Sequence, residues 1–144
     1  MKPTLLLAIL LFLTSCGQIT KSPQSQNTDS QTTTTKFENI DFSKFNIKLS
    51  QKTEKMTPKE VMQLYYPHKK GDEGNEQIIL SEKILNNKNT EVTLIHEGLL
   101  DDSIRGYQYK MILKKKKDHW KVASLKKNWK CYRGHSYWGI ELCH

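Results

Sequence analysis

The sequence lacks the short motifs that mark many catalytic and cofactor-binding sites. Its 144 residues include only 7 glycines, and none of them forms a glycine-rich loop that could cradle a phosphate group. There is no Ser-His-Asp signature of a hydrolase. The histidines lack the paired spacing of a zinc site; they are His68, His96, His119, His135 and His144. We therefore expect neither a bound metal nor a cofactor.

Long hydrophobic runs are also missing. The longest is Leu5–Leu13, which is far shorter than the roughly 20 apolar residues that a helix needs to cross a bilayer. The run follows the basic residue Lys2 and precedes the small residues Thr14 and Ser15. This layout is typical of a secretory signal peptide.

The four residues Leu13-Thr14-Ser15-Cys16 resemble the lipobox of bacterial lipoproteins. The resemblance implies that residues 1–15 are removed and that Cys16 is lipidated, which anchors the protein in a membrane through its acyl chains. In a Gram-negative cell, Gly17 in place of an aspartate implies the outer membrane. The alternative is an ordinary secretory peptide with an incidental cysteine.

The chain after Cys16 divides into a polar segment and a folded domain. Residues 17–36 are rich in Gln, Ser, Thr and Asn, and such a segment cannot bury enough apolar surface to offset the entropy of ordering it. We expect residues 16–36 to be a disordered tether that starts at the lipidated cysteine. Residues 37–144 have the length of one small domain with a modest core.

The domain begins with a helix signal and continues with strand signals. Thr57, Pro58 and Glu60 predict a capping box, and Val61, Leu64 and Tyr65 then share one helix face. After Pro67 the apolar period changes to two, which predicts strands. The expected strands are 78–85, 90–96, 107–113 and 120–127, with an acidic turn at 97–103 and a lysine-rich turn at 115–119.

These elements predict an α+β domain: one short helix packed on a curved antiparallel meander of about four strands, followed by a disulfide-closed loop. The order of helix and meander resembles small cystatin-like and NTF2-like domains. Cys131 and Cys143 remain once Cys16 carries lipid, and an exported compartment favours their pairing. Free thiols or a metal site are the alternatives.

Positive charge is concentrated in the last third of the chain. Residues 105–144 contain 11 Lys/Arg and 2 Asp/Glu, and the densest run is Lys114, Lys115, Lys116 and Lys117. Such a surface favours anionic partners outside the cell, such as lipid headgroups or acidic envelope polymers; in that compartment we expect no nucleic acid. The alternative is a solvated lysine-rich strand that blocks edge-to-edge pairing.

The C-terminal segment combines aromatic, basic and cysteine residues. Its pattern resembles the tail of small bacterial lipoproteins and secreted domains of unknown role; the matching residues are Trp129, Cys131, Arg133, Gly134, His135, Trp138 and Cys143. In one interpretation, Arg133, His135 and Trp138 bind an anionic or ring-shaped ligand. In the other, the segment is a structural clasp in which His135 binds a backbone carbonyl and Arg133 pairs with a carboxylate.

The sequence thus predicts a non-enzymatic envelope lipoprotein with a binding or structural role. One alternative is a binder of anionic envelope polymer through the basic C-terminal third. The other is a small NTF2-like enzyme, which would need a pocket that contains His96 or Asp102 as part of an acid/base pair. Against it, Asp101, Asp102 and Ser103 read as turn residues whose side chains bind local backbone.

Overall fold

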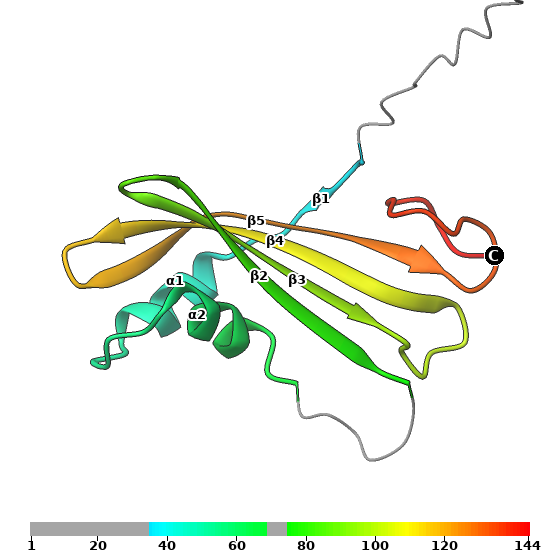
Figure 1. The fold of residues 1–144 in the computed structure, drawn as a ribbon, viewed down its shortest axis with the longest axis horizontal. Coiled ribbons are helices and arrows are strands. Elements are labelled where there is room, and N and C mark those ends of the chain that lie inside the picture. Colours follow the sequence, from blue (N-terminus) through cyan, green and yellow to red (C-terminus); the bar gives the residue numbers. More distant parts are fainter. Residues whose placement is uncertain (1–34, 69–74) are drawn as a thin grey trace, which may run out of the picture. The chain divides into compact units, whose positions relative to one another are not determined.

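The computed structural model describes residues 35–68 and 75–144, which form two helices and five strands (Figure 1). The elements in chain order are β1 (Glu38–Asn39), α1 (Ser43–Ser50), α2 (Pro58–Tyr65), β2 (Gln77–Asn86), β3 (Asn89–Glu97), β4 (Ile104–Lys116) and β5 (His119–Cys131). The expected signal peptide, Cys16 and all but the last residues of the expected tether lie outside the described residues.

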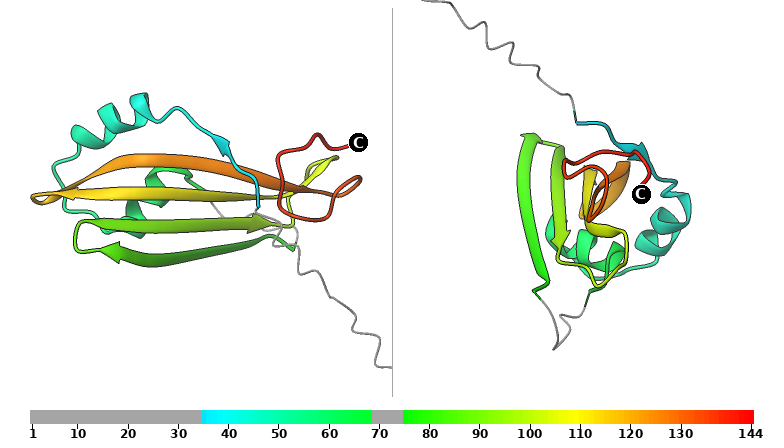
Figure 2. Two further views of the ribbon diagram at one scale, coloured as in Figure 1. Left: turned by 90° about the horizontal axis from the view of Figure 1, so that it is seen from above. Right: turned by 90° about the vertical axis from the view of Figure 1, so that its right-hand side faces the viewer.

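The strands form one open antiparallel sheet in the order β1-β5-β4-β3-β2. The α+β class with a helix packed on an antiparallel meander is therefore confirmed. The short β1 and a second helix, α1, add to the predicted elements. Figures 1 and 2 show the turn of the β4–β5 hairpin and the C-terminal segment at opposite ends of the long strands.

The core lies between the two helices and one face of the sheet. Its buried side chains are Leu49, Val61, Met62, Val92, Leu94, Tyr109, Met111, Leu113, Val122 and Leu125. Strict alternation along β3 and along residues 108–113 of β4 buries every second residue on the face that carries this core, as a period of two requires. The period of two predicted for residues 90–96 and 107–113 is confirmed.

Helix α2 begins as its capping box predicts. The Glu60 amide donates to Thr57 Oγ1 at 3.3 Å, and the Thr57 amide donates to a Glu60 carboxylate oxygen at 2.7 Å. These two bonds satisfy amides that a helix start leaves free. Val61, on the predicted apolar face of α2, is fully buried. This face is therefore the one that packs on the sheet.

One side chain of helix α1, Asn46, forms two hydrogen bonds with the backbone of β5. The Asn46 amide group donates to the Val122 carbonyl at 3.0 Å and accepts from the Val122 amide at 2.9 Å. Leu49, one turn further along, is buried in the core. Close by, the Trp120 indole donates to the Met56 carbonyl at 2.9 Å, which ties the connection between the helices to the same strand.

The predicted turn at residues 115–119 is too long. Strand β4 continues to Lys116 and β5 starts at His119, and these two residues pair. The turn is therefore only Lys117 and Asp118, and Lys117 takes a left-handed backbone conformation with φ of 52°. The apolar period ends at Leu113, but backbone pairing continues along the hairpin without burial of the lysines.

Candidate functional site

The C-terminal segment folds back on the end of β5. Cys131 and Cys143 form a disulfide with their Cα atoms 5.5 Å apart, which confirms the predicted pair. Trp129 and Gly139 exchange two backbone hydrogen bonds of 2.9 and 3.0 Å. The segment is therefore held to β5 by one covalent link and a short backbone ladder.

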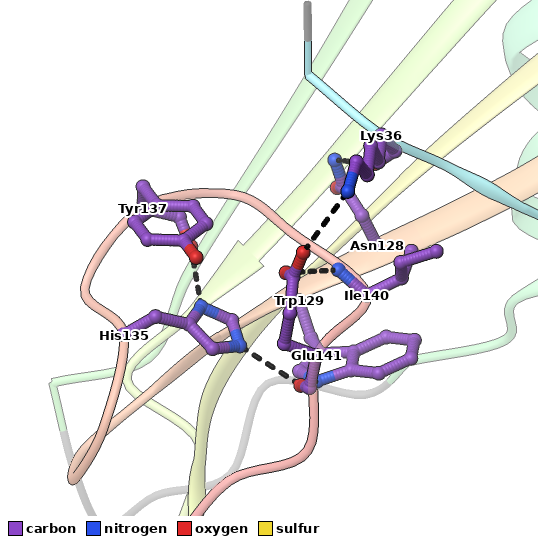
Figure 3. A network of polar contacts seen from close by, with 7 residues as sticks. All are labelled: Lys36, Asn128, Trp129, His135, Tyr137, Ile140 and Glu141. Carbon is purple, nitrogen blue, oxygen red and sulfur yellow. Dashed lines mark hydrogen bonds and ion pairs between the residues drawn. The ribbon is translucent and has the colours of Figure 1, made fainter. Parts of the chain in front are cut away.

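His135 lies inside this fold-back and contacts backbone carbonyls through both ring nitrogens. Nδ1 lies 2.9 Å from the Tyr137 carbonyl, and Nε2 lies 2.9 Å from the Glu141 carbonyl (Figure 3). The Trp129 indole also donates to the Glu141 carbonyl, at 2.9 Å. These are the contacts that the clasp interpretation expects of His135.

The other two residues predicted at this site make different contacts. Arg133 is exposed and forms no ion pair with any described residue, so the carboxylate partner that the clasp interpretation assigned to it is not seen. The Trp138 ring is half-buried under the Lys130 ammonium, 4.4 Å from the ring centre, and Lys130 pairs with Glu97 at 2.7 Å. Within residues 75–144, no hydrogen bond, ion pair or ring contact joins Arg133, His135 and Trp138 to one another.

The predicted lysines lie together at the opposite end of the sheet. Lys114 pairs with Lys121 across the β4–β5 hairpin, and the Lys115 amide donates to the Lys88 carbonyl of the neighbouring β2–β3 turn at 2.7 Å. We call this surface the basic end; it comprises Lys88, Lys114, Lys115, Lys116, Lys117 and Lys121. All six are exposed, and none forms an ion pair with a residue of the described ranges.

A third group of polar residues is partly buried between α2 and the sheet, and we call it the His–Glu cluster: Tyr66, His68, Glu76 and His96. Alternation along β3 places His96 on the helix-covered face with Val92 and Leu94. Tyr66 and His68 follow the end of α2, and Glu76 precedes β2, whose Ile78 pairs with His96.

The ionisable side chains of this cluster are close to one another. The His68 Nε2 atom lies 3.2 Å from one Glu76 carboxylate oxygen, and His96 Nε2 lies 3.9 Å from the other. The centres of the two imidazole rings are 4.3 Å apart. The side chains of His68, Glu76 and His96 are only 20%, 14% and 2% exposed, so water screens their interactions weakly.

Hydrogen bonding in the cluster is incomplete. The Tyr66 hydroxyl lies 2.8 Å from His96 Nδ1, whereas Nε2 of His96 and Nε2 of His68 are buried without a hydrogen-bond partner in the described residues. The 3.2 Å contact of His68 with Glu76 is near enough for attraction but is not aligned as a hydrogen bond. Burial lowers the pKa of His96, the neighbouring His68 lowers it further, and Glu76 opposes both effects.

No local sequence pattern indicates this cluster, because its members come from three separate segments of the chain. Three of its side chains could each offer one ligand atom to a metal, with all these atoms within 4.8 Å of one another. Cys131, His135 and Cys143 are equally close, but the disulfide engages both sulfurs.

Asp102, the other residue considered for an acid/base pair, is exposed in the 98–103 loop. Its neighbour Asp101 accepts hydrogen bonds from the amides of Ser103 and Ile104.

Comparison with known proteins gives no match: no protein family, curated protein or solved structure is similar to this chain. Among the described residues, neither helix has the length and apolar character required to cross a bilayer.

Proposed function

We propose that the protein is an exported lipoprotein, held at a membrane through Cys16, whose folded domain binds an anionic envelope polymer. The observation that supports this proposal is the basic end: six exposed lysines with no acidic partner among the described residues. The lipobox residues Leu13–Cys16 support the anchor. A phosphate- or carboxylate-rich polymer would supply the negative charges that the domain does not.

The position of the lysines argues against edge protection. Lysines that block edge-to-edge pairing are expected on an edge strand. One edge strand is β2, which carries Lys83 alone and leaves Ile79 and Ile84 exposed. The other edge is β5 wherever β1 does not cover it, and β1 pairs only with Lys126 and Lys127. Lys114 lies between Asn89 of β3 and Lys121 of β5, whereas Lys115 and Lys116 extend past the end of β3 and pair with β5 only. Of the six lysines only Lys121 belongs to a strand that is open at the edge, so a binding role accounts for the whole basic end better than protection does.

The test is binding of the full-length protein, in detergent, to a poly(glycerol phosphate) chain, with neutral dextran as the uncharged control. The triple variant Lys115→Glu/Lys116→Glu/Lys117→Glu should bind at least roughly 100-fold more weakly, given about 1 kcal/mol for each lysine near an anionic surface. The matched variant Lys44→Glu/Lys48→Glu/Lys59→Glu makes the same change in net charge at exposed positions of the helices. It should retain binding.

Salt provides the second measurement. Raising the NaCl concentration from about 50 mM to about 500 mM should weaken the wild-type complex strongly, because exposed charges are then screened over a few ångströms. Equal losses in the two triple variants would show attraction by net charge without a defined surface. Binding that does not respond to salt would refute the electrostatic proposal.

The anchor is tested separately in cells. Wild-type protein should incorporate a labelled fatty acid and sediment with membranes, and the Cys16→Ser variant should do neither. A variant that is still acylated would refute the assignment of Cys16. That result would leave polymer binding unaffected, so the two halves of the proposal fail independently.

A further inference from the structure

We propose that His68, Glu76 and His96 form a binding site for one divalent transition-metal ion, of which Zn²⁺ is the reference. The ligand atoms would be Nε2 of each histidine and a carboxylate oxygen of Glu76. This site is distinct from the basic end and does not depend on polymer binding. It departs from the expectation of no metal that the histidine spacing gave.

The spacing of the donor atoms fits a single ion. Zinc binds histidine nitrogen at about 2.0–2.1 Å and carboxylate oxygen at about 2.0–2.2 Å, so two ligands of one tetrahedral ion lie roughly 3.3–3.5 Å apart. The His68–Glu76 contact of 3.2 Å is already at this separation, and the His96–Glu76 contact of 3.9 Å is slightly longer. All three donor atoms lie within 4.8 Å of one another, so the side chains would have to draw together slightly to hold one ion.

The unsatisfied nitrogens point to a ligand. Buried polar atoms in proteins nearly always have a hydrogen-bond partner. Here the Nε2 atoms of His68 and His96 are both buried, lack such a partner in the described residues, and lie beside the same carboxylate. The His96 side chain is only 2% exposed, so water does not readily satisfy it. A metal ion would use both lone pairs and neutralise Glu76.

Tyr66 is placed to orient one of the ligands. If His96 Nδ1 carries the proton and donates it to the Tyr66 oxygen, 2.8 Å away, the lone pair of His96 lies on Nε2, on the side of Glu76. Metal-binding histidines commonly have such a partner on the other ring nitrogen. The hollow beside the cluster is lined by His68, Glu76, Gln77, Ile78 and Ile79, which leaves a side from which a fourth ligand can reach the ion.

The donor set limits the metals that the site would take. Two imidazoles and one carboxylate suit Zn²⁺, Fe²⁺, Co²⁺ or Ni²⁺ better than Ca²⁺ or Mg²⁺, which prefer oxygen ligands. Three protein ligands with an open position are found in catalytic zinc sites, whereas structural sites use four.

The experiment is calorimetric titration of the full-length protein with ZnCl₂, after removal of metal by a chelator and without thiol reductant, so that Cys131 and Cys143 stay paired. We expect one Zn²⁺ per chain. Glu76→Gln and His68→Gln should each weaken binding by about 100-fold, the upper end of what even indirect partners of a metal contribute. The matched controls His119→Gln and Glu82→Gln, at exposed positions outside the cluster, should bind as the wild type does.

Cobalt gives an independent readout, because tetrahedral Co²⁺ has visible absorption bands that a weakly held surface ion lacks. Failure of wild-type protein to bind Zn²⁺ saturably would overturn the proposal. So would binding that survives in both cluster variants or is lost in His119→Gln. If His68 and Glu76 only interact with each other, Glu76→Gln will alter thermal stability, while zinc will change the stability of neither the wild type nor the variant. His96→Gln is less useful, since loss of a fully buried side chain can unfold the protein.

Discussion

The hydroxyl of Tyr66 lies 2.8 Å from Nδ1 of His96, which joins the end of α2 to β3 just before its end at Glu97. The two rings meet edge to face with their centres 5.8 Å apart. Burial raises the pKa of the Tyr66 hydroxyl, and the neighbouring Tyr107 and Glu76 raise it further. The hydroxyl therefore keeps its proton at neutral pH and holds the His96 ring in one orientation.

Replacement of Tyr66 by phenylalanine should weaken zinc binding by about 10–100-fold, because the variant removes a partner of a ligand without removing the ligand. The measurement is the zinc dissociation constant, together with the visible spectrum of the Co²⁺-loaded protein. Tyr65→Phe is the matched control, since the Tyr65 hydroxyl makes no hydrogen bond within the described ranges. Unchanged zinc affinity with lower thermal stability would assign Tyr66 to packing alone.

Loss of the disulfide should destabilise the domain. Closing a loop with a sequence separation of 12 restricts the unfolded chain, and chain-entropy estimates give about 3 kcal/mol for a loop of this size. The double variant Cys131→Ala/Cys143→Ala should lose this amount in urea unfolding; alanine is chosen because Cys131 is buried. Cys16→Ser should unfold as the wild type does. A loss well below about 1 kcal/mol would mean that the backbone ladder holds the segment without the covalent link.

The turn of the basic hairpin should gain stability from glycine at position 117. Lys117 has a φ of 52°, a conformation that costs an L-residue roughly 1 kcal/mol and a glycine nothing. Allowing for the greater freedom of glycine in the unfolded chain, Lys117→Gly should raise the free energy of unfolding by about 0.5 kcal/mol. Lys116→Gly, one residue earlier in β4, should lower it. Equal losses in both variants would contradict this account of the turn.

Asp101 should contribute to stability only above acidic pH. Hydrogen bonds from the amides of Ile104 and Ser103 lower the pKa of its carboxyl from the usual 3.8. A lowered folded-state pKa stabilises the protein above the unfolded-state value, and this stabilisation is lost as pH falls through the folded-state pKa. The difference in urea midpoint between wild type and Asp101→Asn should thus be largest near pH 7 and shrink as the carboxyl becomes protonated. A difference that is constant with pH would assign the effect to geometry rather than charge.

The sequence predicted the parts of the fold that local patterns specify. The capping box at Thr57 and Glu60 and the alternation around Val92 and Tyr109 are local signals, and both are confirmed. Helix α1 carried a weaker signal, since its contact with the sheet depends on Asn46, whose partner Val122 lies 76 residues away. Strand β1 is only two residues long, which is too short to show an alternation of apolar and polar residues.

Local sequence patterns could not predict the His–Glu cluster, for a different reason. His68 and His96 are 28 positions apart in the chain and share no motif with Glu76. They meet because α2 lies across β3 and because the register of β2 sets Ile78 opposite His96. The basic run Lys114–Lys117 was visible in the sequence, but its separation from the C-terminal segment was not. That separation follows from the length of β4 and β5, 13 residues each.

The entry of the chain into the domain has a mechanical consequence. The Lys36 carbonyl accepts a hydrogen bond from Asn128, the Phe37 ring lies under the ammonium groups of Lys110 and Lys126, and β1 adds two residues to the edge of β5. Tension on the chain ahead of Lys36 therefore loads these contacts first. They would break and release a few residues of slack before the load reached α1 or the core. A protein pulled from this side would lengthen before it unfolded.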